Sequence, residues 1–245
     1  ALEATGDLLF SVPGFTVLTG LATVKLNSTT TDFAAANRRI DIDGVVAFLT
    51  MGPGAATSAL QSVSVEGLSV DIAGFVTFGG DFAMRKDATG DIEVAAEQAF
   101  ARLEAGSFQV GVTDASLALL LKADGGKALE ASGGLLFSVP GFTVNAGTAT
   151  VKLNTTRTDF RAVADGGTGH RTIDIDGISA TLTMGAGPLQ SVSVVGLSVD
   201  IADFVTFSGD FGFRKDATGD IEAAANHASA SLRAGPLRIG ITDEV

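Results

Sequence analysis

The feature that most constrains the fold of this chain is an internal duplication. The run LLFSVPGFTV at residues 8–17 returns at residues 135–144, an offset of 127 residues. The run RKDATGDIE at residues 85–93 returns at residues 214–222, an offset of 129 residues. Because the offset changes between matched blocks, the insertions and deletions fall between them, in loops. Copies related in this way stack on one another and bury a continuous core.

The matched blocks divide the chain into two repeat units, residues 1–127 and residues 128–245. A fainter match links Gly67–Phe75 to Gly134–Phe142. It leaves a second interpretation open, in which each unit consists of two submodules of about 64 residues. No Ser-, Pro- or Gly-rich linker separates the copies, so we expect one elongated body rather than beads on a string.

The second unit ends at Gly240–Asp243, the counterpart of Gly111–Asp114, whereas the first unit continues to Lys127. A unit that stops at this point would leave a strand edge unpaired. We therefore expect the chain to be cut from a longer array. A degenerate last unit is the alternative.

Alternation of apolar and polar residues predicts β-strands. From Leu197 to Phe213 most odd positions are apolar, and the same stripe runs on even positions from Leu68 to Met84. About 17 residues of unbroken alternation predicts unusually long strands. The alanine-rich segment 94–103 also favours a strand, with a helix as the alternative. We predict an all-β fold of long antiparallel strands in a repetitive, elongated meander, either solenoid-like or a stacked sandwich, with little or no helix.

The apolar stripe changes parity at several points. Beside Glu66-Gly67 and Val195-Gly196 the change is typical of a β-bulge. At Thr113-Asp114 and Pro140-Gly141 we interpret it as a corner, where a long strand passes from one sheet layer to another. Hairpin loops are predicted where Asp, Gly or Pro cluster, at residues 86–91, 215–220, 123–126 and 234–236.

Composition narrows the function classes. The net charge is −12 and the pI is near 4.4, so a phosphate backbone would be repelled and nucleic acid is not an expected partner. Acidity of this kind suits either the solubility of a long secreted polymer or the recruitment of cations. No uncharged apolar run reaches the roughly 18 residues of a spanning helix, so no transmembrane segment is expected.

Catalytic groups are scarce. The chain has no cysteine, and its two histidines, His170 and His227, have no histidine at the matching place in the other copy. No nucleophile-elbow, phosphate-loop or dinucleotide-binding motif is present. We therefore expect no catalytic residues, no bound cofactor and no enzymatic activity.

Carboxylates are the one group of candidate site residues that recurs at matched positions in both units. The IDIDG run places two Asp residues two positions apart, on the same face of a strand, and the KDATGD run places two Asp residues at a glycine-containing turn. Hard cations such as Ca²⁺ take oxygen ligands from loops of this kind, although the spacing matches no EF-hand. The alternative is that each Asp hydrogen-bonds its own turn. The candidate calcium ligands are Asp41, Asp43, Asp87, Asp91, Asp174, Asp176, Asp216 and Asp220.

Asn27 and Asn154 stand at matched positions in Asn-x-Thr sequences, which also fit an N-glycosylation acceptor. We favour a Thr-rich turn at the end of a strand as the role of both.

The blocks LLFSVPGFTV, KDATGDIE and GVTDASLALLLKADGGKALEASGG resemble the tandem β-repeats of giant bacterial surface or secreted proteins, broadly the adhesin-like class. The resemblance covers nearly the whole chain, but it lies in the general pattern of the repeats and includes no diagnostic motif. It implies an extended extracellular or cell-surface scaffold for a stalk, filament or adhesin. Neighbouring repeats, self-association and cell-surface or glycan ligands would be its partners. The alternative is a β-rich binding module that holds lipid or another apolar ligand in a hydrophobic groove.

Overall fold

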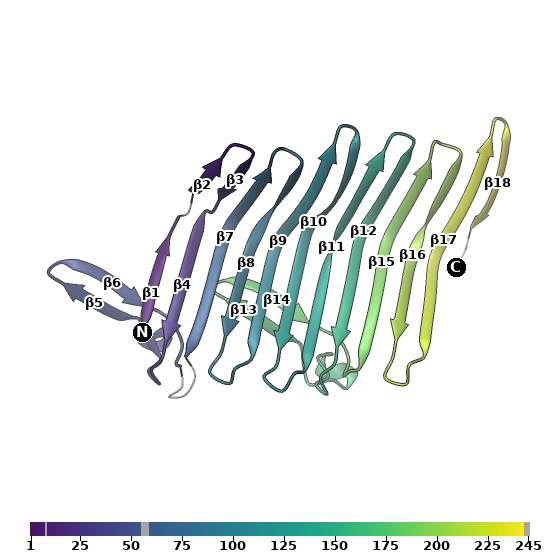
Figure 1. Cartoon of the computed structure of the whole chain (residues 1–245). Coiled ribbons are helices and arrows are strands. Elements are labelled where there is room, and N and C mark those ends of the chain that lie inside the picture. Colours follow the sequence, from purple (N-terminus) through teal and green to yellow (C-terminus); the bar gives the residue numbers. More distant parts are fainter. Residues whose placement is uncertain (8, 55–58, 243–245) are drawn as a thin grey trace.

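A computed structural model describes residues 1–7, 9–54 and 59–242. Leu8, the first residue of the duplicated run, and Asp243, the last residue matched between the units, lie outside the described residues. Within them, the chain forms one 14-stranded antiparallel sheet that runs as a meander from one end of the molecule to the other (Figure 1). The predicted all-β fold of long antiparallel strands is confirmed.

Across the sheet, the fourteen strands fill twelve successive positions, which we call strand levels. β1 and β2 follow each other along one level, and β3 and β4 follow each other along the next, so each unit provides six levels. The strands of the sheet are β1 (Leu2–Gly6), β2 (Leu9–Val12), β3 (Phe15–Leu18), β4 (Leu21–Asn27), β7 (Leu60–Ile72), β8 (Val76–Lys86), β9 (Ile92–Ala105), β10 (Phe108–Leu121), β11 (Lys127–Val139), β12 (Phe142–Asn154), β15 (Leu189–Ile201), β16 (Val205–Lys215), β17 (Ile221–Ala234) and β18 (Leu237–Thr242).

Each unit carries one insertion between two of its long strands, and this insertion contains a short hairpin of its own. In the first unit the hairpin is β5 (Arg38–Ile42) and β6 (Val45–Leu49), and in the second it is β13 (Arg171–Ile175) and β14 (Ile178–Leu182). The two hairpins form separate two-stranded sheets. Figure 1 shows β13–β14 lying across the large sheet, whereas β5–β6 projects beyond β1.

The bulges predicted at Glu66-Gly67 and Val195-Gly196 are confirmed, since the pairing of β7 with β8 and of β15 with β16 shifts register there. Opposite them, a carboxylate holds each bulge: Asp81 accepts from the Gly67 amide at 2.7 Å, and Asp210 accepts from the Gly196 amide at 2.7 Å. A bulge of this kind inserts one residue without leaving the sheet. The apolar side chains therefore stay on one face although their sequence parity changes.

Two expectations about long strands are wrong. The proposed corner at Thr113-Asp114 is a bulge inside β10, and the one at Pro140-Gly141 is the tight turn between β11 and β12, so no strand changes layer there. The alternation from Leu197 to Phe213 spans two strands, because Ile201 pairs with Val205 across a three-residue loop. A loop of that length keeps the parity of the stripe, which is why the sequence pattern passes through the turn.

The predicted hairpin loops and the strand at the alanine-rich segment are confirmed. Among the described residues, helix is confined to one turn in the first part of each insertion. In the first unit it is α1 (Phe33–Ala36), capped by the carboxylate of Asp32, and in the second it is the 3-10 turn η1 (Val163–Asp165). The sequence showed no capped helix pattern here, since a single turn is too short for a periodic signal.

Candidate functional site

A buried asparagine fixes the root of each insertion. The Asn154 side chain is fully buried; its Nδ2 donates to the carbonyls of Thr158 and Gly185 at 2.9 and 2.7 Å, and its Oδ1 accepts from the amide and hydroxyl of Thr156. Asn27 makes the same four bonds in the first unit. A fully buried side chain leaves no room for a glycan, and the Thr-rich turn is the role that these contacts fit.

From this root the β13–β14 hairpin crosses the sheet over β8, β9, β10 and β11, which belong mainly to the preceding unit. We call this contact the inter-repeat dock. Its floor consists of four alanines, which let the hairpin lie close to the sheet, and one leucine. The dock contains Ala83, Ala95, Ala118, Leu120 and Ala128 from the sheet, and Ile173, Ile175, Ile178, Ala180 and Leu182 from the hairpin. All ten are buried.

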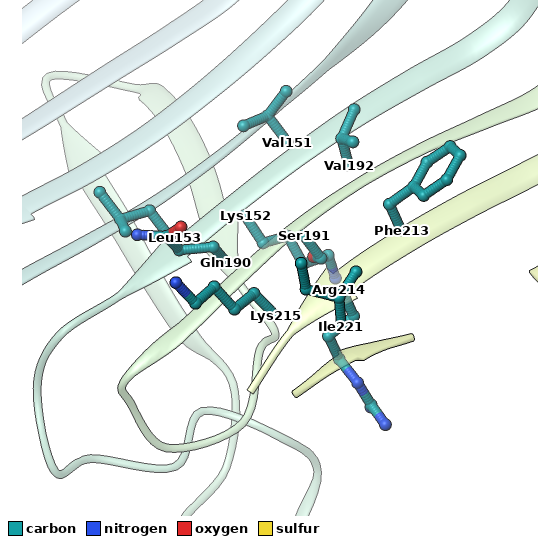
Figure 2. A pocket seen from close by; sticks show the side chains of 10 residues that line it. All are labelled: Val151, Lys152, Leu153, Gln190, Ser191, Val192, Phe213, Arg214, Lys215 and Ile221. Atoms are coloured by element: carbon teal, nitrogen blue, oxygen red, sulfur yellow. The ribbon is translucent and has the colours of Figure 1, made fainter. Parts of the chain in front are cut away.

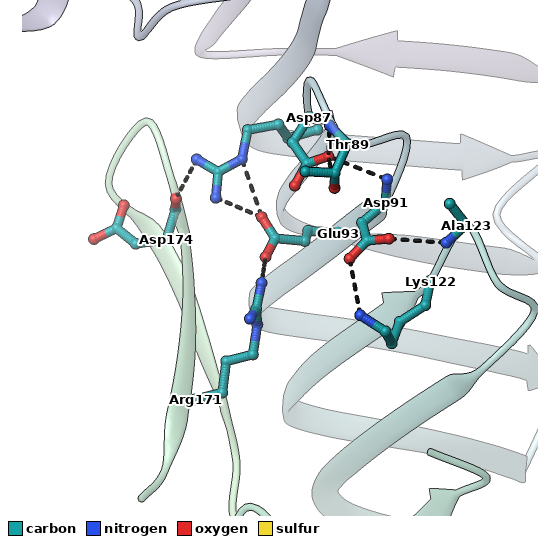
Figure 3. A network of polar contacts seen from close by, with 9 residues as sticks. Asp87, Thr89, Asp91, Glu93, Lys122, Ala123, Arg171 and Asp174 are labelled. Atoms are coloured by element: carbon teal, nitrogen blue, oxygen red, sulfur yellow. Dashed lines mark hydrogen bonds and ion pairs between the residues drawn. The ribbon is translucent and has the colours of Figure 1, made fainter. Parts of the chain in front are cut away.

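A buried carboxylate lies at one side of the dock. Glu93 on β9 has a side chain only 4% exposed, and it accepts from Arg85 Nε of the same sheet at 3.0 Å and from Arg171 of the hairpin. Arg85 also donates to the Asp174 carbonyl at 3.1 Å, so the two units share one network (Figure 3). Two guanidinium groups around one carboxylate compensate the cost of its burial.

The tip of the hairpin reaches two further strands of the first unit. Asp176 accepts from Lys25 Nζ of β4 at 2.5 Å and from the Ser64 hydroxyl of β7 at 3.0 Å. Burial alone lowers the pKa of Lys25, but the hydrogen bond and charge of Asp176, together with those of Glu3, outweigh burial and raise the pKa. The ammonium group is therefore held charged at the dock.

The base of the hairpin is held by its own unit. Thr183 donates its amide to Glu130 at 2.7 Å, and Lys152 lies 2.9 Å from Glu130 and 2.9 Å from the Thr183 hydroxyl. The β5–β6 hairpin has the same base, since Thr50 bonds Glu3 and accepts from Lys25. Both hairpins thus leave the sheet by the same set of contacts.

The turn acids predicted as calcium ligands hold turns. Asp87 accepts from the Thr89 amide and hydroxyl and from the Asp91 amide, and Asp216 does the same in the second unit. Burial opposes this and raises the pKa of Asp87, but the hydrogen bonds bring it below its usual value. Hydrogen bonds from Thr218, stronger than the effect of desolvation, likewise lower the pKa of Asp216.

The remaining candidates are not brought together into one site. Asp91 accepts from the Ala123 amide at 2.8 Å, and Asp220 accepts from the Thr218 hydroxyl. In the hairpins, Asp41 and Asp174 accept from the amides of Gly44 and Gly177. The expectation that both Asp residues of each IDIDG run share a strand face is wrong: β5 ends at Ile42 and β13 at Ile175, and the second Asp of each run lies in the turn with a left-handed backbone. Across the described part of the chain, no three His, Asp or Glu side chains gather where they could hold a metal ion. Calcium binding stays a prediction.

The opposite face of the sheet is apolar and uncovered. It carries a shallow groove of about 410 Å³ lined by Val151, Leu153, Val192, Phe213 and Ile221 (Figure 2), and a second groove of about 430 Å³. The second is the repeat counterpart of the first, because its lining residues are the matched Val24, Leu26, Val63, Met84 and Ile92. The units therefore repeat an apolar groove on one face and a polar, small-residue floor on the other.

Neither histidine lines the two grooves or the inter-repeat dock. His227 lies 3.3 Å from Asp210 beside a bulge and is exposed, while His170 precedes the β13–β14 hairpin.

Together these features define a single-layer antiparallel sheet of tandem repeats in which an inserted hairpin of one unit docks on the unit before it. Comparison of the chain with protein-family models, with curated proteins and with solved structures finds no match. Among the described residues no helix has the length and apolar character needed to cross a membrane.

Proposed function

We propose that this chain is a structural repeat segment of a long extracellular bacterial protein, serving as the scaffold of a stalk, filament or adhesin without catalysis. The observation that carries this proposal is the continuity of the sheet across the repeat boundary. β11 begins at Lys127 and pairs with β10 of the first unit from Lys127 to Ser138, with one bulge. On its other side β11 pairs with β12, which in turn pairs with β15 of the second unit. The boundary is an ordinary strand pair rather than a linker.

The inter-repeat dock supports the same conclusion. The hairpin of the second unit buries its apolar side chains on the first unit and forms ion pairs with Glu93 and Lys25. The second unit therefore contacts the first in two ways, through the sheet and through the hairpin. Such nearest-neighbour coupling is the property that lets a repeat protein extend in one dimension while staying rigid.

Small-angle scattering tests the scaffold function. Six strand levels spaced about 4.8 Å apart predict that each added unit lengthens the sheet by about 29 Å. The experiment compares this chain with a variant in which residues 1–127 are present twice. A maximum dimension that grows by this increment supports a continuous scaffold. A profile in which the extra unit folds back to a compact particle, or moves independently on a linker, would contradict it.

The apolar face favours a second candidate function, the binding of lipid or another apolar ligand. Grooves lined by matched valines, leucines and aromatic or methionine side chains recur in both units, with lysines Lys86 and Lys215 at their edges. Exposed apolar surface of this extent commonly marks an interaction site.

Native mass spectrometry of the purified chain separates the two functions. Copurified lipid that is lost in Val192→Asp but retained in Thr150→Asp, a change on the other face of the neighbouring strand β12, would favour the binding module. The absence of any lipid adduct would leave the scaffold function as the one supported.

A further inference from the structure

The two insertion hairpins are close in sequence but differ sharply in burial. Ile175 and Ile178 of the β13–β14 hairpin are 2% and 3% exposed, whereas their counterparts Ile42 and Val45 are 65% and 75% exposed. The difference arises because the described sheet ends at β1, which contacts the base of β6, so that no further strand lies beneath the tip of the β5–β6 hairpin. The hairpin therefore presents an apolar face for which the chain shows a complementary surface elsewhere, at the inter-repeat dock.

The second unit carries the counterpart of the β8 and β9 part of the dock floor, and this part is open. Gly212 and Ala224 match Ala83 and Ala95, the small residues on which β13–β14 rests, and Ala224 is exposed. Beside them stands Glu222, the counterpart of Glu93. Its side chain is 55% exposed against 4% for Glu93, and in the described part of the chain Arg214 is its one ion-pair partner.

The charges that would close this second dock are already present. Arg38 stands where Arg171 stands in the occupied dock, and Asp43 stands where Asp176 does. In the second dock the partner for Asp43 would be Lys152, the counterpart of Lys25. Lys152 contacts Glu130 and Thr183 as Lys25 contacts Glu3 and Thr50, but the described residues contain no third partner for it corresponding to Asp176.

We propose that the β5–β6 hairpin of one copy of this chain docks on β16, β17 and β18 of a second copy, reproducing between molecules the inter-repeat dock. In this contact Ile42 and Val45 cover Ala224, Arg38 pairs with Glu222, and Asp43 pairs with Lys152. The proposal rests on the scaffold function and names its partner, a second copy of the same repeat.

The proposed contact has a definite symmetry. It joins the β5–β6 end of one copy to the β18 end of another, so it is heterologous and leaves one free surface of each kind after every addition. Docking in this way places β2 of the incoming copy alongside β18 of the other copy, just as β11 lies alongside β10 within the chain. The product is an open row of copies rather than a closed dimer.

Two parts of the occupied dock are missing from the proposed one. β18 matches only Phe108–Thr113 of β10, so the described residues contain no counterpart of the dock residues Ala118 and Leu120. Ser179 donates to Glu97 at 2.9 Å, but the matched positions hold Val46 and Asn226. The intermolecular dock thus lacks one charge-assisted hydrogen bond, and we expect a reversible, concentration-dependent association.

Sedimentation velocity on the whole chain at increasing concentration tests the proposal. The wild type should form species larger than a dimer. Glu222→Arg and Arg38→Glu should each weaken this association roughly tenfold or more, because each places like charges together. An equal mixture of the two variants should regain it, since every junction between unlike chains then pairs opposite charges. A wild type that stays monomeric, or a mixture no better than its components, would overturn the proposal.

A second pair of variants distinguishes specific docking from non-specific hydrophobic association. Val45→Asp changes the docking face of the hairpin and should abolish association, whereas Phe48→Ser changes the outer face, where Phe48 is 48% exposed, and should leave it intact. Circular dichroism checks that every variant keeps its sheet. Equal effects of the two changes, or none, would refute the dock. The scattering increment per added unit does not depend on this association, so failure of the dock and failure of the scaffold function are distinguishable.

Discussion

Asn154 and Asn27 show how a single side chain can anchor an insertion of about thirty residues. Each fills four hydrogen-bonding positions at a place where the backbone would otherwise be buried without partners. Gly187 comes so close that a Cβ on it would lie 2.2 Å from the Asn154 carbonyl oxygen. The root is therefore closed to larger side chains as well as to water.

Replacing Asn154 should be costly. Asn154→Ala leaves a buried amide and two carbonyls without partners, so we expect the free energy of unfolding to fall by about 2–4 kcal/mol in denaturant titrations. Asn145→Ala, at an exposed position of the same strand, serves as the control and should change it by less than about 0.5 kcal/mol. Equal effects of the two changes would show that the root hydrogen bonds do not anchor the insertion.

The ion pair of Lys25 with Asp176 should make the dock sensitive to alkaline pH. The folded pKa of Lys25 is raised, so its contribution is fully present below the unfolded pKa of about 10.4 and is lost as pH rises through the folded value. The stability difference between wild type and Asp176→Asn, measured by denaturant unfolding, should shrink above about pH 10.4. A difference that is constant through this range would mean that Lys25 does not titrate in the pair.

The turn acids carry the calcium prediction, and a thermal melt with and without chelator tests it. A cation bound only to the folded state would raise the melting temperature by mass action. Because Asp87 and Asp216 already accept three hydrogen bonds each within their own turns, we expect the chelator to leave the melt unchanged. A large drop would instead establish calcium as a structural component.

At the scale of the elements, the dock depends on small residues beneath the β13–β14 hairpin. Ala95→Leu should force the hairpin away from β9 and lower the free energy of unfolding by about 1–3 kcal/mol. Ala224→Leu is the matched control in the second unit, where no hairpin covers the site in the isolated chain. At low concentration its effect should stay within about 0.5 kcal/mol, and a loss equal to that of Ala95→Leu would indicate a strand effect rather than a packing effect.

Several elements could be predicted from the sequence because their signals are local. The bulge at Glu66-Gly67 shows itself as a one-residue change of parity beside glycine, and the KDATGD loop as a turn. The wrong predictions arise where different local structures produce the same sequence pattern. A bulge, a tight hairpin at Pro140-Gly141 and a corner between layers all change parity, and only the strand that pairs on each side distinguishes them.

At the scale of the whole molecule, the dock should make the sheet unevenly stable. β8 is paired on both sides and covered by β13–β14, whereas its counterpart β16 is paired on both sides and uncovered. In native-state hydrogen exchange of the monomer, amides of residues 82–86 should therefore exchange more slowly than those of residues 211–215. Equal protection would show that the hairpin adds nothing to the stability of the sheet beneath it.

The sequence by itself determined that the molecule is duplicated and all-β, which residues share a face, and where most turns fall. These properties depend on neighbours within a few positions along the chain. Only the tertiary structure decided that the sheet is one layer and that two nearly matching hairpins have different environments. Those outcomes depend on contacts such as Lys25 with Asp176, which lie 151 residues apart in sequence. A hairpin is buried or exposed according to the strands beneath it, and its own residues do not specify them.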